Sequence, residues 1–185
     1  MGLKIITAPV AEPVSVAEAK AHLKVDISDD DALIGALITA AREECEHLTD
    51  RAIAEQTLEL SLDAFPAAGI KLPRPPVSAI TSVEYIDTDG VTQALSGPDY
   101  YFDDAQEPCW ILPAYGEDWP STRDDANAVI VTYEAGYANC PEALRAWILL
   151  RVGTLYTTRM ADSDKPAMPS PFVERIIDRY RVMGV

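Results

Sequence analysis

Cysteine and histidine side chains are the first candidates for chemistry in this chain of 185 residues. Cys140 directly precedes Pro141, where a helix is predicted to begin, and a thiol at a helix N-terminus has a lowered pKa and can act as a nucleophile. The two histidines, His22 and His47, fall in predicted helices and outside any H-E-x-x-H pattern. A Cys–His or Ser–His–Asp site therefore has no local sequence support. We interpret Cys140 as a small buried residue at a helix cap and the histidines as helix-surface residues.

Cysteine and glycine spacing excludes several sites that depend on a local motif. Cys45, Cys109 and Cys140 are far apart and odd in number, which argues against a disulfide framework or a structural zinc site and fits a reducing cytoplasm. No two of the nine glycines lie closer than seven residues, so the chain has no G-x-G-x-x-G fingerprint, P-loop or G-x-S-x-G nucleophile elbow. We expect no catalytic residue, no metal and no cofactor.

Closely spaced carboxylates suggest metal binding or acid–base catalysis. Residues 87–90 read Asp-Thr-Asp-Gly, as in part of a calcium loop, but Tyr85 and Ser96 stand where the first and twelfth ligands would be. A hairpin turn with Gly90 at positive φ explains this segment better. The other acidic runs are predicted to be solvated, at a helix start (29–31) and in loops (103–104 and 124–125).

The charge of the chain limits the partners it can have. Thirty Asp and Glu against fifteen Lys and Arg give a net charge of -15. Such a surface does not grip nucleic-acid phosphates, which are bound by clustered Lys and Arg. The acid is concentrated in the middle, where residues 55–140 carry fifteen acidic and three basic side chains, whereas residues 141–185 carry five and seven. The longest uncharged stretch near a helix, 32–41, is about half of a bilayer span, so we expect no membrane contact.

Two helices are predicted before residue 54. Ser15 and Glu18 form a capping box that starts the first helix, which ends near Val25. The acidic run 28–31 opens the second helix, whose apolar residues recur at helical spacing as far as about Thr49. These two helices can close as a hairpin.

From residue 55 onwards, apolar residues recur at every second position instead of at helical spacing. Leu58, Leu60 and Leu62 alternate with polar residues, as in a strand with one solvated face. Many short strands with turn residues between them indicate an antiparallel sheet or a small barrel. Further strands are expected at 70–72, 83–86, 91–95, 100–102, 110–112 and 128–133.

After residue 140 the chain returns to helix. Pro141 suits the first helical position, with Cys140 or Asn139 as the cap. Three prolines in 161–171 indicate a linker, and a last amphipathic helix is expected from about Phe172 to Val182. An isolated helix of this length is marginal in water, so its apolar stripe must dock on something, either a partner or its own domain. The predicted partner interface comprises Phe172, Val173, Arg175, Ile176, Ile177, Arg179, Tyr180 and Arg181.

The predicted fold class is α+β. The order is an N-terminal helical hairpin, a central antiparallel β module, a C-terminal helix packing on the hairpin, and then a linker and a terminal amphipathic helix. The predicted domains are a helical core from 1–54 and 141–160, an inserted acidic β module at 55–140, and a linker with a docking arm at 161–185.

The chain resembles a known family over roughly residues 9–160. Each motif is weak alone, and the ordered set is fairly specific. The segments that carry the resemblance are 13–23 (PVSVAEAKAHL), 40–43 (AARE), 49–52 (TDRA), 56–58 (QTL), 65–66 (FP), 72–76 (LPRPP), 85–87 (YID), 89–90 (DG), 119–120 (WP), 133–137 (YEAGY) and 141–148 (PEALRAWI). On these segments the chain resembles the head-tail connector or adaptor proteins of tailed phages, prophages and gene-transfer particles.

The resemblance implies a structural protein that is not an enzyme. Such a protein forms a ring with copies of itself under the portal protein, extends the DNA channel, and presents a surface to downstream connector or tail proteins. DNA would pass through without specific binding, and an acidic lumen would lower friction by repelling phosphates. The implied location is the connector region of the virion, with assembly in the cytoplasm of the bacterial host. Two alternatives remain open, a small metal-dependent hydrolase that uses acids of the central module and a module that binds a host protein.

Overall fold

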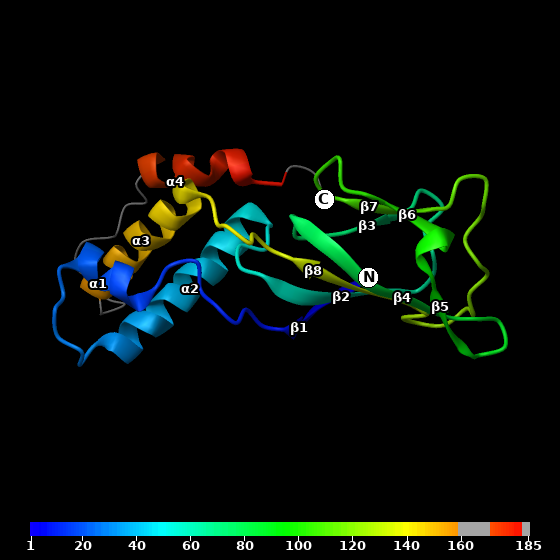
Figure 1. Ribbon diagram of the computed structural model, residues 1–185, viewed down its shortest axis with the longest axis horizontal. Coiled ribbons are helices and arrows are strands. Elements are labelled where there is room, and N and C mark those ends of the chain that lie inside the picture. The colour runs from blue at the N-terminus through cyan, green and yellow to red at the C-terminus, as the bar shows by residue number, and fades with distance from the viewer. Residues whose placement is uncertain (159–170, 183–185) are drawn as a thin grey trace. The chain divides into compact units, whose positions relative to one another are not determined.

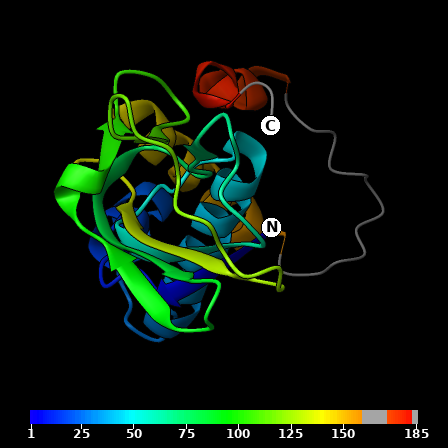
Figure 2. The same cartoon turned by 90° about the vertical axis from the view of Figure 1, so that its right-hand side faces the viewer.

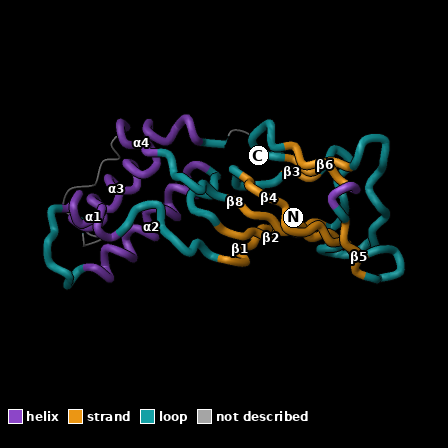
Figure 3. The backbone as a smooth tube through the Cα atoms, in the orientation of Figure 1, coloured by secondary structure: helices purple, strands orange, loops and turns teal. Residues whose placement is uncertain are grey.

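The structure is a computed structural model that describes residues 1–158 and 171–182, without the side chains of the first two residues of the last helix. Contacts along the chain separate two compact units, which we call the β unit (residues 1–10 and 55–136) and the helical unit (residues 11–54 and 137–185). Figure 3 shows the strands in orange and the helices in purple. The mixture of helices and antiparallel strands confirms the predicted α+β class.

The β unit contains two antiparallel sheets. Five strands form the larger sheet in the order β1-β2-β8-β4-β5, and three form the smaller one in the order β3-β7-β6. Figures 1 and 2 both show β8 running alongside β2 and β4. The strands are β1 (Gly2–Thr7), β2 (Gln56–Leu62), β3 (Ile70–Lys71), β4 (Val77–Ile86), β5 (Thr92–Leu95), β6 (Tyr100–Asp103), β7 (Trp110–Pro113) and β8 (Val129–Ala135), with a one-turn helix η1 (Gly97–Asp99) before β6.

Alternating apolar residues build the core of the larger sheet. Leu60 of β2 lies opposite Val131 of β8, which lies opposite Val83 of β4, and all three are fully buried. In the smaller sheet the buried Ile70 of β3 lies opposite the buried Ile111 of β7. The period of two in the sequence therefore marks the buried face of each strand.

The helical unit packs four helices around one apolar cluster. They are α1 (Val16–Leu23), α2 (Asp31–Thr49), α3 (Glu142–Thr157) and α4 (Pro171–Ile177), and a 3-10 turn, η2 (Asp178–Tyr180), follows α4. The predicted capping box starts α1, since the Glu18 amide donates to Ser15 Oγ (3.2 Å) and Glu18 Oε2 accepts from the Ser15 amide (2.8 Å). Buried apolar residues from α2 and α3 fill the centre: Ile34, Ile38, Ala41, Cys45, Leu144, Trp147, Ile148 and Val152.

The first strand differs from the prediction, which placed residues 1–54 in the helical part. Gly2–Thr7 instead form β1, an edge strand that pairs with β2, so residues 1–10 belong to the β unit. All six residues of β1 are exposed. A strand exposed on both faces needs no alternation of apolar and polar residues, and its sequence therefore lacks the signal used to find the other strands.

Two helix ends also differ from the prediction. Pro141 occupies the N-cap position of α3 (φ -56°, ψ 137°) rather than the first helical position, because its ψ is extended. The last α-helix ends at Ile177, five residues before the expected end, and continues only as the 3-10 turn of η2. Among the described residues, no helix is both long enough and apolar enough to span a bilayer.

Candidate partner interface

The apolar stripe of the predicted arm packs on the helical unit itself. Ile177 is fully buried in the apolar cluster, and Val173, Ile176 and Tyr180 pack against the same cluster. Helix α4 contacts α3. The side chain of Phe172 lies outside the described residues. Of the two docking modes left open by the sequence, the described stripe adopts the intramolecular one.

Arg51, in the loop that follows α2, fastens the end of the arm. Its side chain is 8% exposed, and its Nε donates a hydrogen bond to the backbone carbonyl of Tyr180. Its Nη1 donates to the hydroxyl of Tyr137 (3.3 Å). The amide of Val182 donates to the carbonyl of Thr49, the last residue of α2 (2.9 Å). These bonds fix the backbone that follows η2 against the end of α2.

The outer face of the arm is charged and exposed. Arg175, Arg179 and Arg181 point away from the apolar cluster, together with Glu174 and Asp178. The Arg179 guanidinium lies 4.7 Å from the centre of the Tyr180 ring, and Arg181 Nε lies 3.3 Å from Asp178 Oδ1. The residues predicted for a partner thus divide into an inner apolar set, which completes the fold, and an outer set of three arginines, which a partner can reach.

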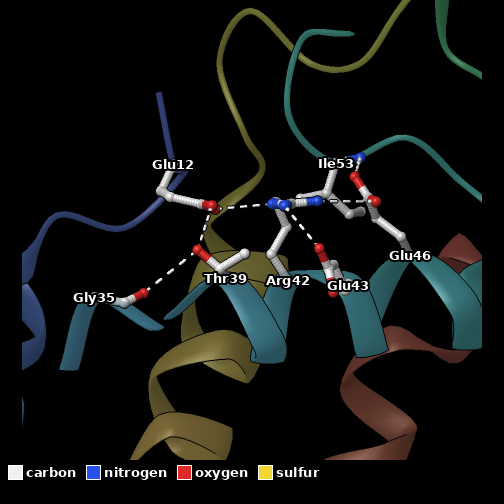
Figure 4. A network of polar contacts seen from close by, with 7 residues as sticks. All are labelled: Glu12, Gly35, Thr39, Arg42, Glu43, Glu46 and Ile53. Atoms are coloured by element: carbon white, nitrogen blue, oxygen red, sulfur yellow. Dashed lines mark hydrogen bonds and ion pairs between the residues drawn. The ribbon is translucent and has the colours of Figure 1, made fainter. Parts of the chain in front are cut away.

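A network of ion pairs and hydrogen bonds surrounds the buried Arg42 in the second half of α2 (Figure 4). Arg42 Nε lies 2.8 Å from Glu12 Oε2, and Arg42 Nη1 lies 3.0 Å from Glu46 Oε2. Glu46 also accepts a hydrogen bond from the amide of Ile53 (2.9 Å). Burial opposes the charge of Arg42, but Glu46 and Glu12 outweigh it and raise the pKa of the guanidinium. Arg42 therefore links the segment that enters α1, helix α2 and the loop after α2.

Both arginines belong to segments that carry the family resemblance, 40–43 and 49–52. Their contacts are structural: Arg42 is ion-paired inside the helical unit, and Arg51 holds the end of the arm. Neither side chain was predicted from the sequence to make these contacts. The pairing of Arg42 with Glu46 could have been predicted, because the two residues are spaced i, i+4 in the predicted helix and residues at this spacing are neighbours.

The thiols are not activated in the way that a nucleophile requires. Burial raises the pKa of Cys140 to about 11, although Arg145 acts in the opposite direction. Burial also raises the pKa of Cys45 to about 12, and it raises the pKa of Cys109. At neutral pH all three are thiols rather than thiolates. Cys140 is half-buried, and neither it nor Asn139 caps α3 as predicted, because Pro141 occupies the N-cap position.

The Asp87 carboxylate serves the hairpin turn between β4 and β5. Its Oδ1 accepts hydrogen bonds from the amides of Asp89 (3.0 Å) and Val91 (2.9 Å), and its Oδ2 accepts from the Gln93 side chain (2.8 Å). The Gln93 and Val91 bonds are the main reasons why the pKa of Asp87 is lowered. Gly90 has φ 83°, as the turn prediction requires. In the described part of the chain, no three metal-ligating side chains gather at one place.

The acidity predicted for the middle of the chain belongs to the β unit. Its two segments, 1–10 and 55–136, carry fifteen acidic and four basic side chains. Many of the acids are exposed, in the β4–β5 turn and in the loops around β6 and β7. This unit therefore offers an anionic surface, and the arm offers exposed arginines.

Comparisons with known proteins identify the relatives of this chain. The family model described as "Phage gp6-like head-tail connector protein" matches residues 13–89. The fold is similar to chains in three solved structures of a gene transfer agent (GTA) particle. These are "Virion of native gene transfer agent (GTA) particle" (23% identity, TM-score 0.83), "Neck of empty GTA particle computed with C6 symmetry" (26%, 0.80) and "Neck of native GTA particle computed with C12 symmetry" (25%, 0.78).

Each of these matches covers 100% of this chain and 97% of the other chain. No curated protein sequence matches it significantly. The family model spans α1, α2, β2, β3 and β4 and reaches the β4–β5 turn. It thus includes Arg42, Glu46 and Asp87, whereas Glu12 lies just before the matched residues. The resemblance to the head-tail connector proteins of phages and gene-transfer particles, predicted from the sequence, is therefore confirmed.

Proposed function

We propose that this chain is a structural head-tail connector of a tailed phage or phage-like particle. The observation that carries the proposal is the full-length likeness to chains from the neck of a gene transfer agent particle. The family model for head-tail connectors independently supports it. Because the matched family is one of structural connectors, we assign no catalytic reaction to the chain.

The connector works as a ring of identical copies in the neck of the virion. The related necks were solved with six-fold and twelve-fold symmetry, which supports a ring for this chain as well. A closed ring requires a heterologous interface, in which one surface of each copy meets a different surface of its neighbour. The proposed partners of the ring are the portal protein on one side and downstream connector or tail proteins on the other. Assembly takes place in the cytoplasm of the bacterial host.

The charge of the β unit suits a surface that DNA passes without binding. Fifteen acidic against four basic side chains give this unit most of the negative charge of the chain. Like charges repel over about one Debye length, roughly 8 Å at physiological ionic strength. We therefore place the β unit at the channel or its rim, where it keeps phosphates from adhering.

The exposed arginines of the arm are the proposed contact with the portal. A truncation that removes the arm would also remove Ile177 from the apolar cluster, so it would confuse loss of binding with loss of folding. Charge reversal avoids this, because Arg175, Arg179 and Arg181 are exposed and their side chains lie outside the cluster.

The experiment compares two triple variants for binding to purified portal rings. The first is R175E/R179E/R181E, and the control is K4E/K24E/R123E, which changes three exposed residues and alters the net charge equally. We expect the arm variant to lose portal binding by at least about tenfold, as buried or rim charge contacts do when one partner is reversed, and the control to bind normally. Equal binding by the two variants would show that the arginines of the arm do not contact the portal.

A further inference from the structure

An aromatic cavity on the β unit is not used by any contact described so far. It measures about 370 Å³ and lies between the loop after β2 and the loop after β7. Phe65 and Trp119 form one wall, and Pro113 and Pro120 lie beside them. The volume falls in the range typical of pockets that bind ligands or side chains.

The aromatic wall is held in place before anything binds. The Phe65 and Trp119 rings are stacked, with centroids 4.7 Å apart and planes 8° apart. The Tyr85 ring packs edge-on against Phe65 at 5.6 Å. The indole N–H of Trp119 donates to the carbonyl of Pro66 (3.1 Å), so its orientation is fixed. A preformed wall lowers the entropic cost of binding.

The chemistry of the cavity favours proline rings next to a cation. Flat aromatic walls are the surfaces on which polyproline II segments dock. The indole N–H is already bonded to Pro66, and one face of each stacked ring is covered by the other ring. The remaining ring surfaces and the hydroxyls of Ser121 and Thr122 are the groups of this lining that a ligand can contact. Asp118 is exposed on the same lining and can pair with a positive charge beside the prolines.

This chain contains a segment with these properties. Residues 165–169 read Lys-Pro-Ala-Met-Pro. They lie outside the described residues, so only their sequence enters the argument. Pro166 and Pro169 are three residues apart in the sequence, which equals the repeat of a polyproline II helix. Lys165 carries the opposite charge to Asp118, on a unit in which acids outnumber bases by fifteen to four.

We propose that the Phe65–Trp119 cavity binds residues 165–169 of a second copy of this chain. The inference rests on the proposed ring, because it supplies the heterologous contact that a ring requires: a cavity on one copy and a proline segment on the next. Repeated around the ring, each copy gives one segment and receives one.

The test measures binding of a fluorescently labelled peptide of residues 163–172 by fluorescence polarisation. The receiving protein is the full-length P166A/P169A variant, whose own segment should compete less than the wild-type segment. We expect saturable binding that is at least about tenfold weaker for a peptide with the same two alanines. Equal binding of the two peptides would overturn the proposal.

Two variants of the receiving protein locate the binding surface. W119A removes half of the aromatic wall and should weaken binding by about tenfold or more. Because W119A could also disturb folding, D118K provides a second probe at an exposed position, with D124K as its matched control on the same loop. We expect D118K to weaken binding and D124K to leave it nearly unchanged. Equal effects of D118K and D124K would show that the peptide responds to net charge rather than to this cavity, which overturns the site.

The intact chain distinguishes a second copy from the same copy. If the segment binds a neighbour, the wild-type chain should block the labelled peptide increasingly as protein concentration rises. Blocking that is independent of concentration would overturn the contact between copies. The peptide assay needs no particles, so its failure would leave the connector role standing, whereas normal tail joining without this chain would remove the connector role and leave peptide binding unaffected.

Discussion

The helical unit and the β unit differ in where their charged side chains lie and in how these are paired. In the helical unit, Arg42 is buried and paired with Glu12 and Glu46, and the half-buried Arg151 is paired with Glu44. In the β unit, acids outnumber bases by fifteen to four and many remain at the surface, in turns and loops. The first arrangement specifies a fold, because a buried charge tolerates only one geometry. The second gives the β unit a negative surface potential, which would repel DNA phosphates in the proposed channel.

The difference also separates the residues that carry the family resemblance from those that would contact partners. Segments 40–43 and 49–52 contain Arg42 and Arg51, and both side chains are committed to internal contacts. The outer arginines of the arm lie beyond the part matched by the family model. The family signature thus reports how the helical unit is built, and the surfaces used in assembly must be found from exposure and charge.

The largest effect is expected from Arg42→Ala, which breaks the network of the helical unit. Glu46 is 2% exposed and would lose its ion pair with Arg42, and removing one partner of a buried pair costs about 3–5 kcal/mol. The free energy of unfolding from urea titration measures this loss. Lys4→Ala, in an exposed pair with Glu59 in the β unit, is the control and should cost less than about 1 kcal/mol. Similar losses of unfolding free energy for both variants would contradict the claim that ion pairs stabilise the helical unit more than the β unit.

Ile177→Ala tests whether the arm belongs to the core of the helical unit. The side chain is fully buried in the apolar cluster, and truncating such a residue costs about 2–5 kcal/mol. Arg179→Ala, on the outer face of the same segment, should change the free energy of unfolding by less than about 0.5 kcal/mol. An Ile177→Ala protein as stable as the wild type would mean that α4 does not dock there in solution.

Thiol reactivity tests the burial of the cysteines without a mutation. The pKa of Cys140 is raised from 9.0 to about 11, so its thiolate fraction at pH 8 falls about a hundredfold, and that of Cys45 falls further. Alkylation by iodoacetamide should therefore be slow in the folded protein and fast in urea. Mass spectrometry assigns the labelled residues. Rapid labelling of Cys140 in the folded chain would reopen the nucleophile hypothesis.

The smallest effect is expected from Asp87→Asn in the β unit, and it should depend on pH. The folded-state pKa of Asp87 lies below its ordinary value of 3.8, so its charge stabilises the turn above about pH 4 and this contribution disappears as pH falls through the lowered pKa. The wild-type protein and Asp87→Asn should thus differ in unfolding free energy at pH 5, and the difference should shrink as the pH falls through the lowered pKa of Asp87. Asp89→Asn is the control from the same turn. A difference that grows on acidification would contradict the assigned sign.

Local chemistry in the sequence predicted much of the fold. The capping box at Ser15 and the turn at Gly90 were both expected, because each depends on residues within a few positions. Strand β1 was not expected, because an edge strand exposed on both faces leaves no alternating pattern. The contacts of Arg42 and Arg51 were also missed, since a charged residue in a helix or after it is usually solvated, and only the three-dimensional structure brings Glu12 and Tyr180 to them.

The candidate interface was predicted only in outline. The sequence identified an amphipathic arm, but could not decide whether its stripe covers a partner or its own unit, since both satisfy the same apolar pattern. The structure assigns the inner residues of the arm to the fold and leaves three arginines outside. The stacked Phe65 and Trp119 were not predicted as a pair, because 53 residues separate Trp119 from Pro66, whose carbonyl orients it.

The connector role is tested most directly by electron microscopy of particles produced in cells that lack this chain. The account predicts heads that accumulate without attached tails, and recovery of tailed particles when the chain is supplied from a plasmid. Tailed particles formed at normal yield in its absence would contradict the account.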